Sequence, residues 1–210
     1  MLPKQIQEKG ILAKLLEKGI KILLRKECNQ IGKVKIDIDA SSIQIIKGII
    51  NKVHIIAEEI NYKDLLFDKI ELEANKLKIN LQLKNKGLRF KNEPKIKFKL
   101  SLSESCLKKI LLSKKWNWIT NKITKEILNQ DKLDDLIIKN DHILIKASTD
   151  TNAINEYKKL EIKAEKGKIY LTNKTHNKSI NIPIEDKVYV KDATIENNLI
   201  IVLASSTISF

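Results

Sequence analysis

The sequence predicts an α+β protein in which one long helix is followed by many β-strands. Apolar residues recur every three or four positions through residues 2–27, as in an amphipathic helix. From residue 33 they alternate with polar residues, as in half-buried strands. Helical spacing returns near residues 104–128, where we expect a short helical pair. With 210 residues and no linker-like stretch, we expect a single domain over residues 1–210.

The first segment, residues 2–27, combines an apolar stripe with a lysine-rich opposite face. Pro3 suits a helix start, and Leu16 lies on the apolar stripe. Such a helix is compatible with a membrane surface or with a position against a sheet. The second position is favoured, because the strongly alternating strands that follow need a partner layer.

The strands begin with Val34–Ile38, where valine and isoleucine alternate with lysine and aspartate. The apolar run Ile43–Ile50 is expected to be extended, with a bend or bulge at Gly48. Farther along, the parity of the apolar positions changes at Asn75–Lys76, which predicts a bulge or a short turn. The run Ile96–Leu102 is the clearest strand, because its opposite face carries three lysines and a serine.

The helical pair has its own start signals. Ser103 is a suitable N-cap for residues 104–112, and Ser113 is expected to restart a second helix that carries Trp116. The remainder is β-like, with alternation at 143–147, 160–164, 180–184, 188–190 and 199–203, turns at Gly167 and Asn197–Asn198, and an edge strand around Pro183.

The formal net charge of +14 raises the question of a nucleic-acid partner. However, 38 of the 40 basic residues are lysine, and the chain also holds 36 isoleucines and 18 asparagines. These three residues share AT-rich codons, so codon bias accounts for the charge. Nucleic-acid recognition favours arginine and aromatic side chains, which are scarce here. A nucleic-acid partner is therefore disfavoured, and a lysine-rich polyanion-binding surface is kept as an alternative.

Sequence patterns for chemistry are absent from the chain: it has no glycine-rich phosphate loop, zinc-binding histidine motif or Gly-x-Ser-x-Gly motif. Asp134–Asp135 is expected in a solvated loop, because adjacent carboxylates rarely converge on one substrate. Cys28 and Cys106 lie far apart, which suits a reducing compartment, and Cys106 is expected to be an inert, buried thiol. We therefore expect neither enzymatic activity nor a cofactor or metal site.

The location of the protein follows from two further absences. No run approaches the ~18 apolar residues that span a membrane, and lysines interrupt the first 21 residues where a signal peptide would be apolar. We expect a cytoplasmic protein, or one that is peripheral on the cytoplasmic face of a membrane.

The aliphatic faces of the strands favour contact with an acyl chain, which needs apolar area and little hydrogen bonding. A structural scaffold with a solid core produces the same alternation and is kept as a second alternative.

The order of features resembles the LmeA-like phospholipid-binding family over nearly the whole chain. The resemblance is carried by the N-terminal helix, the segment Ile45–Val53 with its internal glycine, and the passage Leu102–Leu107 from a lysine-alternating strand into a helix. Cys106 stands where the family usually has Asp, and Lys108 where it has Asn, so the resemblance assigns no headgroup site to this turn.

The resemblance implies a strongly curved antiparallel sheet that wraps the long N-terminal helix, akin to tubular lipid-binding domains. It also implies binding of phospholipid or another acyl-chain lipid without chemistry, with carriage between membranes or support of envelope assembly. Peripheral membrane contact would accompany this function. On this hypothesis, Trp116 and Trp118 lie near the mouth of an apolar cavity. Its lining is expected to include Leu16, Ile36, Ile38, Phe98, Leu100 and Ile145.

Overall fold

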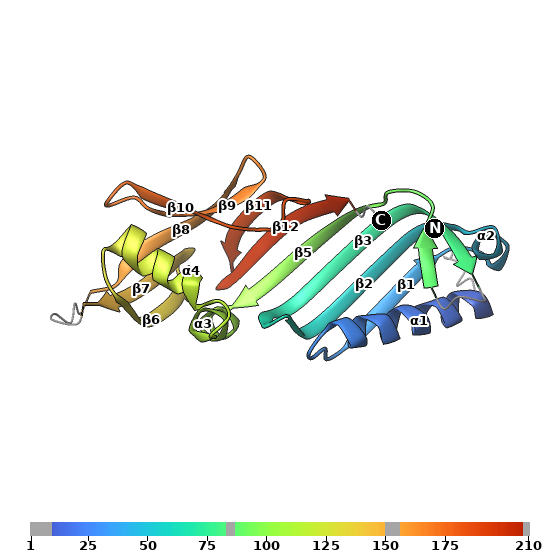
Figure 1. Ribbon diagram of the computed structural model, residues 1–210, viewed down its shortest axis with the longest axis horizontal. Helices are drawn as coiled ribbons and strands as arrows, with labels where there is room; N and C mark the ends of the chain where they lie inside the picture. The colour runs from blue at the N-terminus through green and yellow to red at the C-terminus, as the bar shows by residue number, and fades with distance from the viewer. Residues whose placement is uncertain (1–9, 83–86, 150–155, 208–210) are drawn as a thin grey trace, which may run out of the picture.

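The computed structural model describes residues 10–82, 87–149 and 156–207, and it is an elongated molecule built on two antiparallel sheets (Figure 1). Within these ranges, a seven-stranded sheet lies toward one end and a five-stranded sheet toward the other. Between the two sheets lie helix α3 (Glu104–Leu112) and helix α4 (Asn117–Lys122), and α4 continues into the π-helix η1 (Ile123–Leu128). The predicted α+β class, its antiparallel sheets and its helical segment near residues 104–128 are confirmed.

The larger sheet takes strands from both halves of the chain. Its strands run in the order β1-β2-β3-β5-β12-β11, and β4 pairs with β3 outside this order. The C-terminal hairpin thus lies against β5, which comes from the first half of the chain. The bounds are β1 Val34–Asp39, β2 Ile49–Tyr62, β3 Leu65–Gln82, β4 Gly87–Phe90, β5 Lys95–Ser103, β11 Val188–Glu196 and β12 Leu199–Thr207.

The smaller sheet runs in the order β10-β9-β8-β7-β6. The predicted hairpin turn at Gly167 is confirmed by its positive φ of 80°, and its carbonyl accepts a 3.0 Å hydrogen bond from the Val190 amide of β11. β10 is an edge strand that ends just before Pro183, as predicted. The bounds are β6 Lys132–Lys139, β7 His142–Ser148, β8 Lys158–Glu165, β9 Lys168–Asn173 and β10 Lys178–Ile182.

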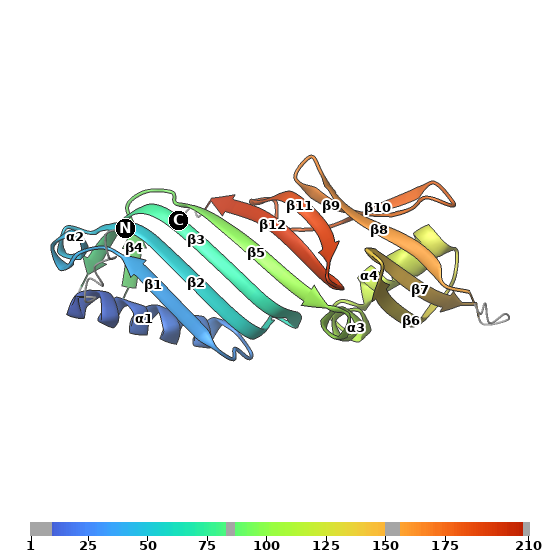
Figure 2. The same ribbon diagram turned by 180° about the vertical axis from the view of Figure 1, so that it is seen from behind.

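Helix α1 (Ile11–Glu27) lies along the β1 end of the larger sheet, as both views show (Figures 1 and 2). Its residues Leu16, Ile20 and Leu24 pack against a core that includes Ile36 and Ile38. The predicted position of the helix against a sheet is therefore observed. The sheets are not strongly curled, however, so the expected wrapping of the sheet around this helix is not confirmed.

Two local predictions are wrong. Within the run expected to be extended, Ser42–Ile46 forms the short helix α2, and β2 begins only at Ile49. A capping box starts this helix: the Ser41 hydroxyl accepts from the Gln44 amide at 3.2 Å, and the Gln44 side chain accepts from the Ser41 amide at 2.8 Å. Asp134–Asp135 lies within β6 at a register shift rather than in a loop.

The change of parity at Asn75–Lys76 is confirmed, but it occurs within a continuous β3 without a shift of register rather than at the expected bulge or short turn. Lys76 has a positive φ of 54°, and the buried positions move from Ala74 to Leu77 across it. The paired strand β2 changes in the same place, since Ile50 and Val53 are both buried there. Both strands therefore exchange their faces together while the register between them is kept.

The buried apolar residues form two separate cores. The larger core lies between β11–β12, the smaller sheet and the helices α3, α4 and η1. The other core lies between α1 and the strands β1, β2 and β3. Both cores use the same face of the larger sheet, because Ile36, Ile55, Leu72, Phe98 and Ala204 are successive partners across five strands.

Candidate functional site

The apolar face of the larger sheet is most exposed at its centre. In the row just named, Ile36, Ile55 and Ala204 are buried at 9, 9 and 6% exposure, whereas Leu72 and Phe98 of the inner strands are only half-buried. The next row repeats this pattern. There Ala57 and Val202 are buried, and Ile70 and Leu100 between them are half-buried.

This distribution has a structural cause. Helix α1 covers β1 and β2, and the smaller sheet with its helices covers β11 and β12, so that neither unit fully covers β3 and β5 (Figures 1 and 2). We call the half-buried apolar residues on this face of the two inner strands the central strip. Its members are Ile70, Leu72, Ile96, Phe98, Leu100 and Leu102.

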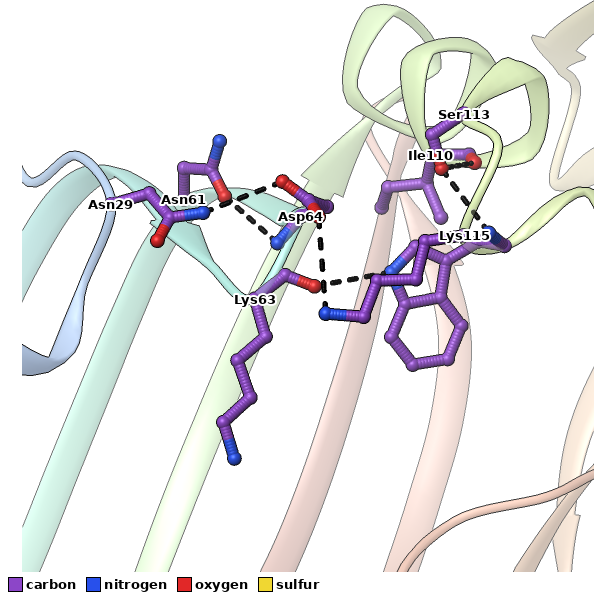
Figure 3. Close-up of polar contacts among 8 residues, drawn as sticks. Asn29, Asn61, Lys63, Asp64, Ile110, Ser113 and Lys115 are labelled. Atoms are coloured by element: carbon purple, nitrogen blue, oxygen red, sulfur yellow. Dashed lines mark hydrogen bonds and ion pairs between the residues drawn. The ribbon is translucent and has the colours of Figure 1, made fainter.

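A network of polar contacts lies at the end of the central strip where β5 leads into α3 (Figure 3). The Lys115 ammonium lies 3.8 Å from the Asp64 carboxylate in the β2–β3 turn, and the Trp116 indole N–H donates to the Lys63 carbonyl at 3.3 Å. The Asn29 side chain, which follows α1, donates to Asp64 at 3.4 Å. The turn thus connects the segment after α1 with the segment between α3 and α4.

The same end is held by Asp68 of β3. Its carboxylate accepts from the Ser103 hydroxyl at 3.1 Å and from the Ser103 amide. Ser103 is the N-cap of α3, as predicted, because its hydroxyl accepts from the Cys106 amide at 3.4 Å. These bonds fix the direction in which α3 leaves β5, and so they fix one end of the central strip.

The opposite face of the larger sheet is charged. Lys97 stands opposite Glu73, and Lys99 opposite Glu71. These side chains, together with Lys191, line an open depression of about 480 Å³. Hydrogen bonds from Lys52 and Asn75 lower the pKa of Glu73 to about 2, so this carboxylate is ionised at neutral pH and offsets the lysine row. Alternating charges of this kind are typical of a solvated face rather than of a polyanion site.

A second depression, of about 510 Å³, lies between the β2–β3 hairpin and α3. Cys106 and Lys109 line it together with Glu58 and Asp68. Burial is the main cause that raises the pKa of the Cys106 thiol, so the group stays protonated at neutral pH. Cys106 is only half-buried, however, so the expectation of a buried thiol is not met. Among the residues that the structure describes, no cluster of three metal-ligating side chains occurs.

The structure separates the residues predicted to line a cavity. Phe98 and Leu100 come together in the central strip. Leu16, Ile36 and Ile38 belong to the core under α1, whereas Ile145, at 1% exposure, lies inside the larger core. Trp116 packs half-buried against the larger core, and Trp118 is 39% exposed with its ring centroid 6.4 Å from that of Trp116.

Four residues of the central strip were not singled out from the sequence: Ile70, Leu72, Ile96 and Leu102. Their alternation marked them as inward-facing, but alternation alone does not say which inward positions stay uncovered. That information needs the pairing of β3 with β5 and the positions of the two covering units.

Comparison with known proteins yields no relative: no family model, curated protein or solved structure matches the chain. No helix in the described residues is long and apolar enough to cross a bilayer.

Proposed function

We propose that this protein binds a phospholipid or another acyl-chain lipid without chemical conversion, and that an acyl chain lies along the central strip. The observation that carries this proposal is the inverted burial of the larger sheet: the apolar side chains of its inner strands are only half-buried, while most of those on its outer strands are buried. An apolar strip of this kind is stabilised when a ligand removes it from water, at roughly 25 cal/mol per Å².

The dimensions of the strip suit an acyl chain. From Ile96 to Leu102 along β5 there are six residue steps, which span about 20 Å at about 3.3 Å per residue. One leaflet of a bilayer has a hydrocarbon depth of roughly 15 Å, half of the ~30 Å core. The strip is therefore long enough for one fully extended tail.

The composition of the strip also favours lipid. All six side chains are hydrocarbon, and the polar pair Asp68–Ser103 lies at one end of the strip. A site for a polar metabolite would present hydrogen-bonding groups that fix its orientation. The resemblance of the chain to the LmeA-like phospholipid-binding family supports the same class of ligand, and carriage between membranes is the role that it suggests.

Two alternatives make different predictions. A polyanion-binding protein would use the lysine row on the charged face, but Glu71 and Glu73 lie beside that row. A scaffold with a solid core would bury the central strip fully, whereas its residues are half-buried at the borders of the two cores. The lipid proposal accounts for both observations.

The test is uptake of a fluorescent phospholipid by the purified protein, measured alongside native mass spectrometry for lipid that co-purifies. The double variant Leu72→Thr/Phe98→Thr keeps strand propensity but removes apolar contact. With about 1–1.5 kcal/mol lost at each half-buried position, its affinity should fall roughly 30- to 150-fold.

The matched control is Lys97→Thr/Lys99→Thr, which alters the other face of β5. It should bind the phospholipid like the wild type. A wild-type protein that takes up no phospholipid, or a strip variant that binds as well as the control, would refute the proposal.

A further inference from the structure

Helix α1 carries a second apolar stripe that packs against nothing in the described structure. Its first stripe, with Ala13 at 2% exposure, faces the sheet. Its second stripe points outward, and four large aliphatic side chains on it are mostly exposed: Ile11 at 78%, Leu15 at 58%, Ile22 at 68% and Leu23 at 53%.

Helix α2 extends this apolar surface. Gly10, the N-cap of α1, lies so close to α2 that an added Cβ would come within 2.5 Å of the Ser42 hydroxyl oxygen. Next to this contact, Ile43, Ile46 and Ile49 are 66, 71 and 41% exposed. Seven of the eleven exposed large apolar residues in the described ranges thus belong to α1, α2 and the start of β2. We call these seven residues the apolar patch.

Basic side chains lie beside the apolar patch. At 3.6 residues per turn, four of the five basic residues of α1 form a stripe directly beside Ile11, Leu15 and Ile22, and the fifth falls on the other side of these residues. Glu17 and Glu27 fall on the side of the helix that faces the sheet. Lys47 follows α2 and is also exposed. The basic stripe of α1 consists of Lys14, Lys18, Lys21 and Arg25.

This combination distinguishes between possible partners. Protein interfaces are depleted of lysine around their apolar centres, so a partner protein is a poor match. An amphipathic helix with lysine and arginine beside an outward apolar stripe is instead typical of a segment that lies in the interface of an anionic membrane. Its aliphatic side chains enter the acyl boundary while the basic side chains remain among the headgroups.

We propose that the apolar patch and the basic stripe of α1 dock this protein on an anionic membrane surface. The docking surface is separate from the central strip, and the inference holds whether or not the strip binds lipid. The inward stripe of α1 stays packed on the core during docking, so the helix need not leave the sheet.

The experiment is flotation of the full chain with vesicles of equimolar phosphatidylglycerol and phosphatidylcholine, compared with vesicles of phosphatidylcholine alone. The wild type should float with the anionic vesicles and dissociate as salt increases. The variant Leu15→Glu/Ile22→Glu should lose this binding. Its control, Leu112→Glu/Tyr189→Glu, changes two equally exposed apolar residues elsewhere and should retain the binding.

A second pair of variants tests the charges. Removal of three basic residues in Lys14→Gln/Lys18→Gln/Arg25→Gln should weaken binding to the anionic vesicles roughly a hundredfold, at about fivefold for each charge. The control Lys139→Gln/Lys168→Gln/Lys178→Gln removes three exposed lysines far from α1 and should have a much smaller effect.

Three outcomes would overturn the inference: no flotation of the folded wild type, equal losses in a variant and its control, or binding that is the same on neutral and anionic vesicles. Sedimentation equilibrium detects a fourth outcome. In it, the wild type is a dimer that does not bind vesicles, and the substitutions Leu15→Glu/Ile22→Glu dissociate this dimer. That result would assign the apolar patch to self-association instead. Failure of phospholipid uptake in solution would bear on the central strip alone.

Discussion

Truncation of a residue in the larger core should destabilise this protein more than truncation of a larger side chain in the central strip. Ile145 is 1% exposed in the larger core, so Ile145→Ala should lower the free energy of unfolding by about 3–4 kcal/mol, within the 2–5 kcal/mol measured for such truncations. Phe98 is larger, but it is only half-buried in the central strip. Phe98→Ala removes roughly half of the usual contact and should cost about 1.5–2 kcal/mol.

Urea unfolding of the lipid-free protein, followed by circular dichroism, measures both losses at a common m-value. Saturating phospholipid should then increase the difference in unfolding free energy between the wild type and Phe98→Ala, because a ligand at 100 times its dissociation constant stabilises the folded state by about 2.7 kcal/mol. The increment should be the same for the wild type and Ile145→Ala. If Phe98→Ala costs as much as Ile145→Ala without lipid, the central strip is ordinary core and the reasoning fails.

Two further predictions concern the framework that holds the site. Gly48 has a φ of +73°, and an added Cβ would collide with the Ile79 carbonyl oxygen, so Gly48→Ala should lower the melting temperature by several degrees. Gly19 has open space around it, so the control Gly19→Ala should not lower the melting temperature. Equal effects of the two substitutions would contradict this prediction. Glu104 accepts from the Ile138 amide at 2.9 Å, and this bond, followed by that from Lys108, lowers its pKa from 4.5. A carboxylate with a lowered folded-state pKa stabilises the protein above its unfolded pKa, and that stability is lost as the pH falls through the lower value. The stability difference between the wild type and Glu104→Gln in urea unfolding should therefore be present at pH 7 and shrink below about pH 4.5, and a difference that persists at the lowest pH would refute the assignment.

Most of the local structure could be predicted from periodicity and turn chemistry. Val34–Ile38 and Ile96–Leu102 lie in strands because strict alternation of apolar and polar residues puts all the apolar side chains on one face only in an extended chain. Asn197–Asn198 forms the expected turn, with both residues at positive φ. Ile43–Ile50 was mistaken for a strand because a short apolar run has no clear period. The capping-box spacing of Ser41 and Gln44 was the signal for a helix that the sequence analysis missed.

The candidate site could be predicted only in part. Phe98 and Leu100 were identified as inward-facing, and they lie on the central strip. Ile36, Ile38 and Ile145 have the same alternation in sequence, yet they are buried in two closed cores, and Leu16 of the helical stripe packs against one of them. The stripe on α1 was predicted as a single apolar surface, whereas the structure divides its aliphatic residues between a packed side and an exposed side.

The sequence by itself determined which residues alternate, where most turns fall and which side of each strand is apolar, because these properties depend on neighbours a few positions apart. Only the tertiary structure decided that β12 lies beside β5, that α1 and the smaller sheet cover opposite ends of one apolar face, and that the apolar residues between them are only half-buried. Coverage depends on segments that are far apart in the chain and meet only after folding. The half-buried central strip and the exposed apolar patch both arise at that level.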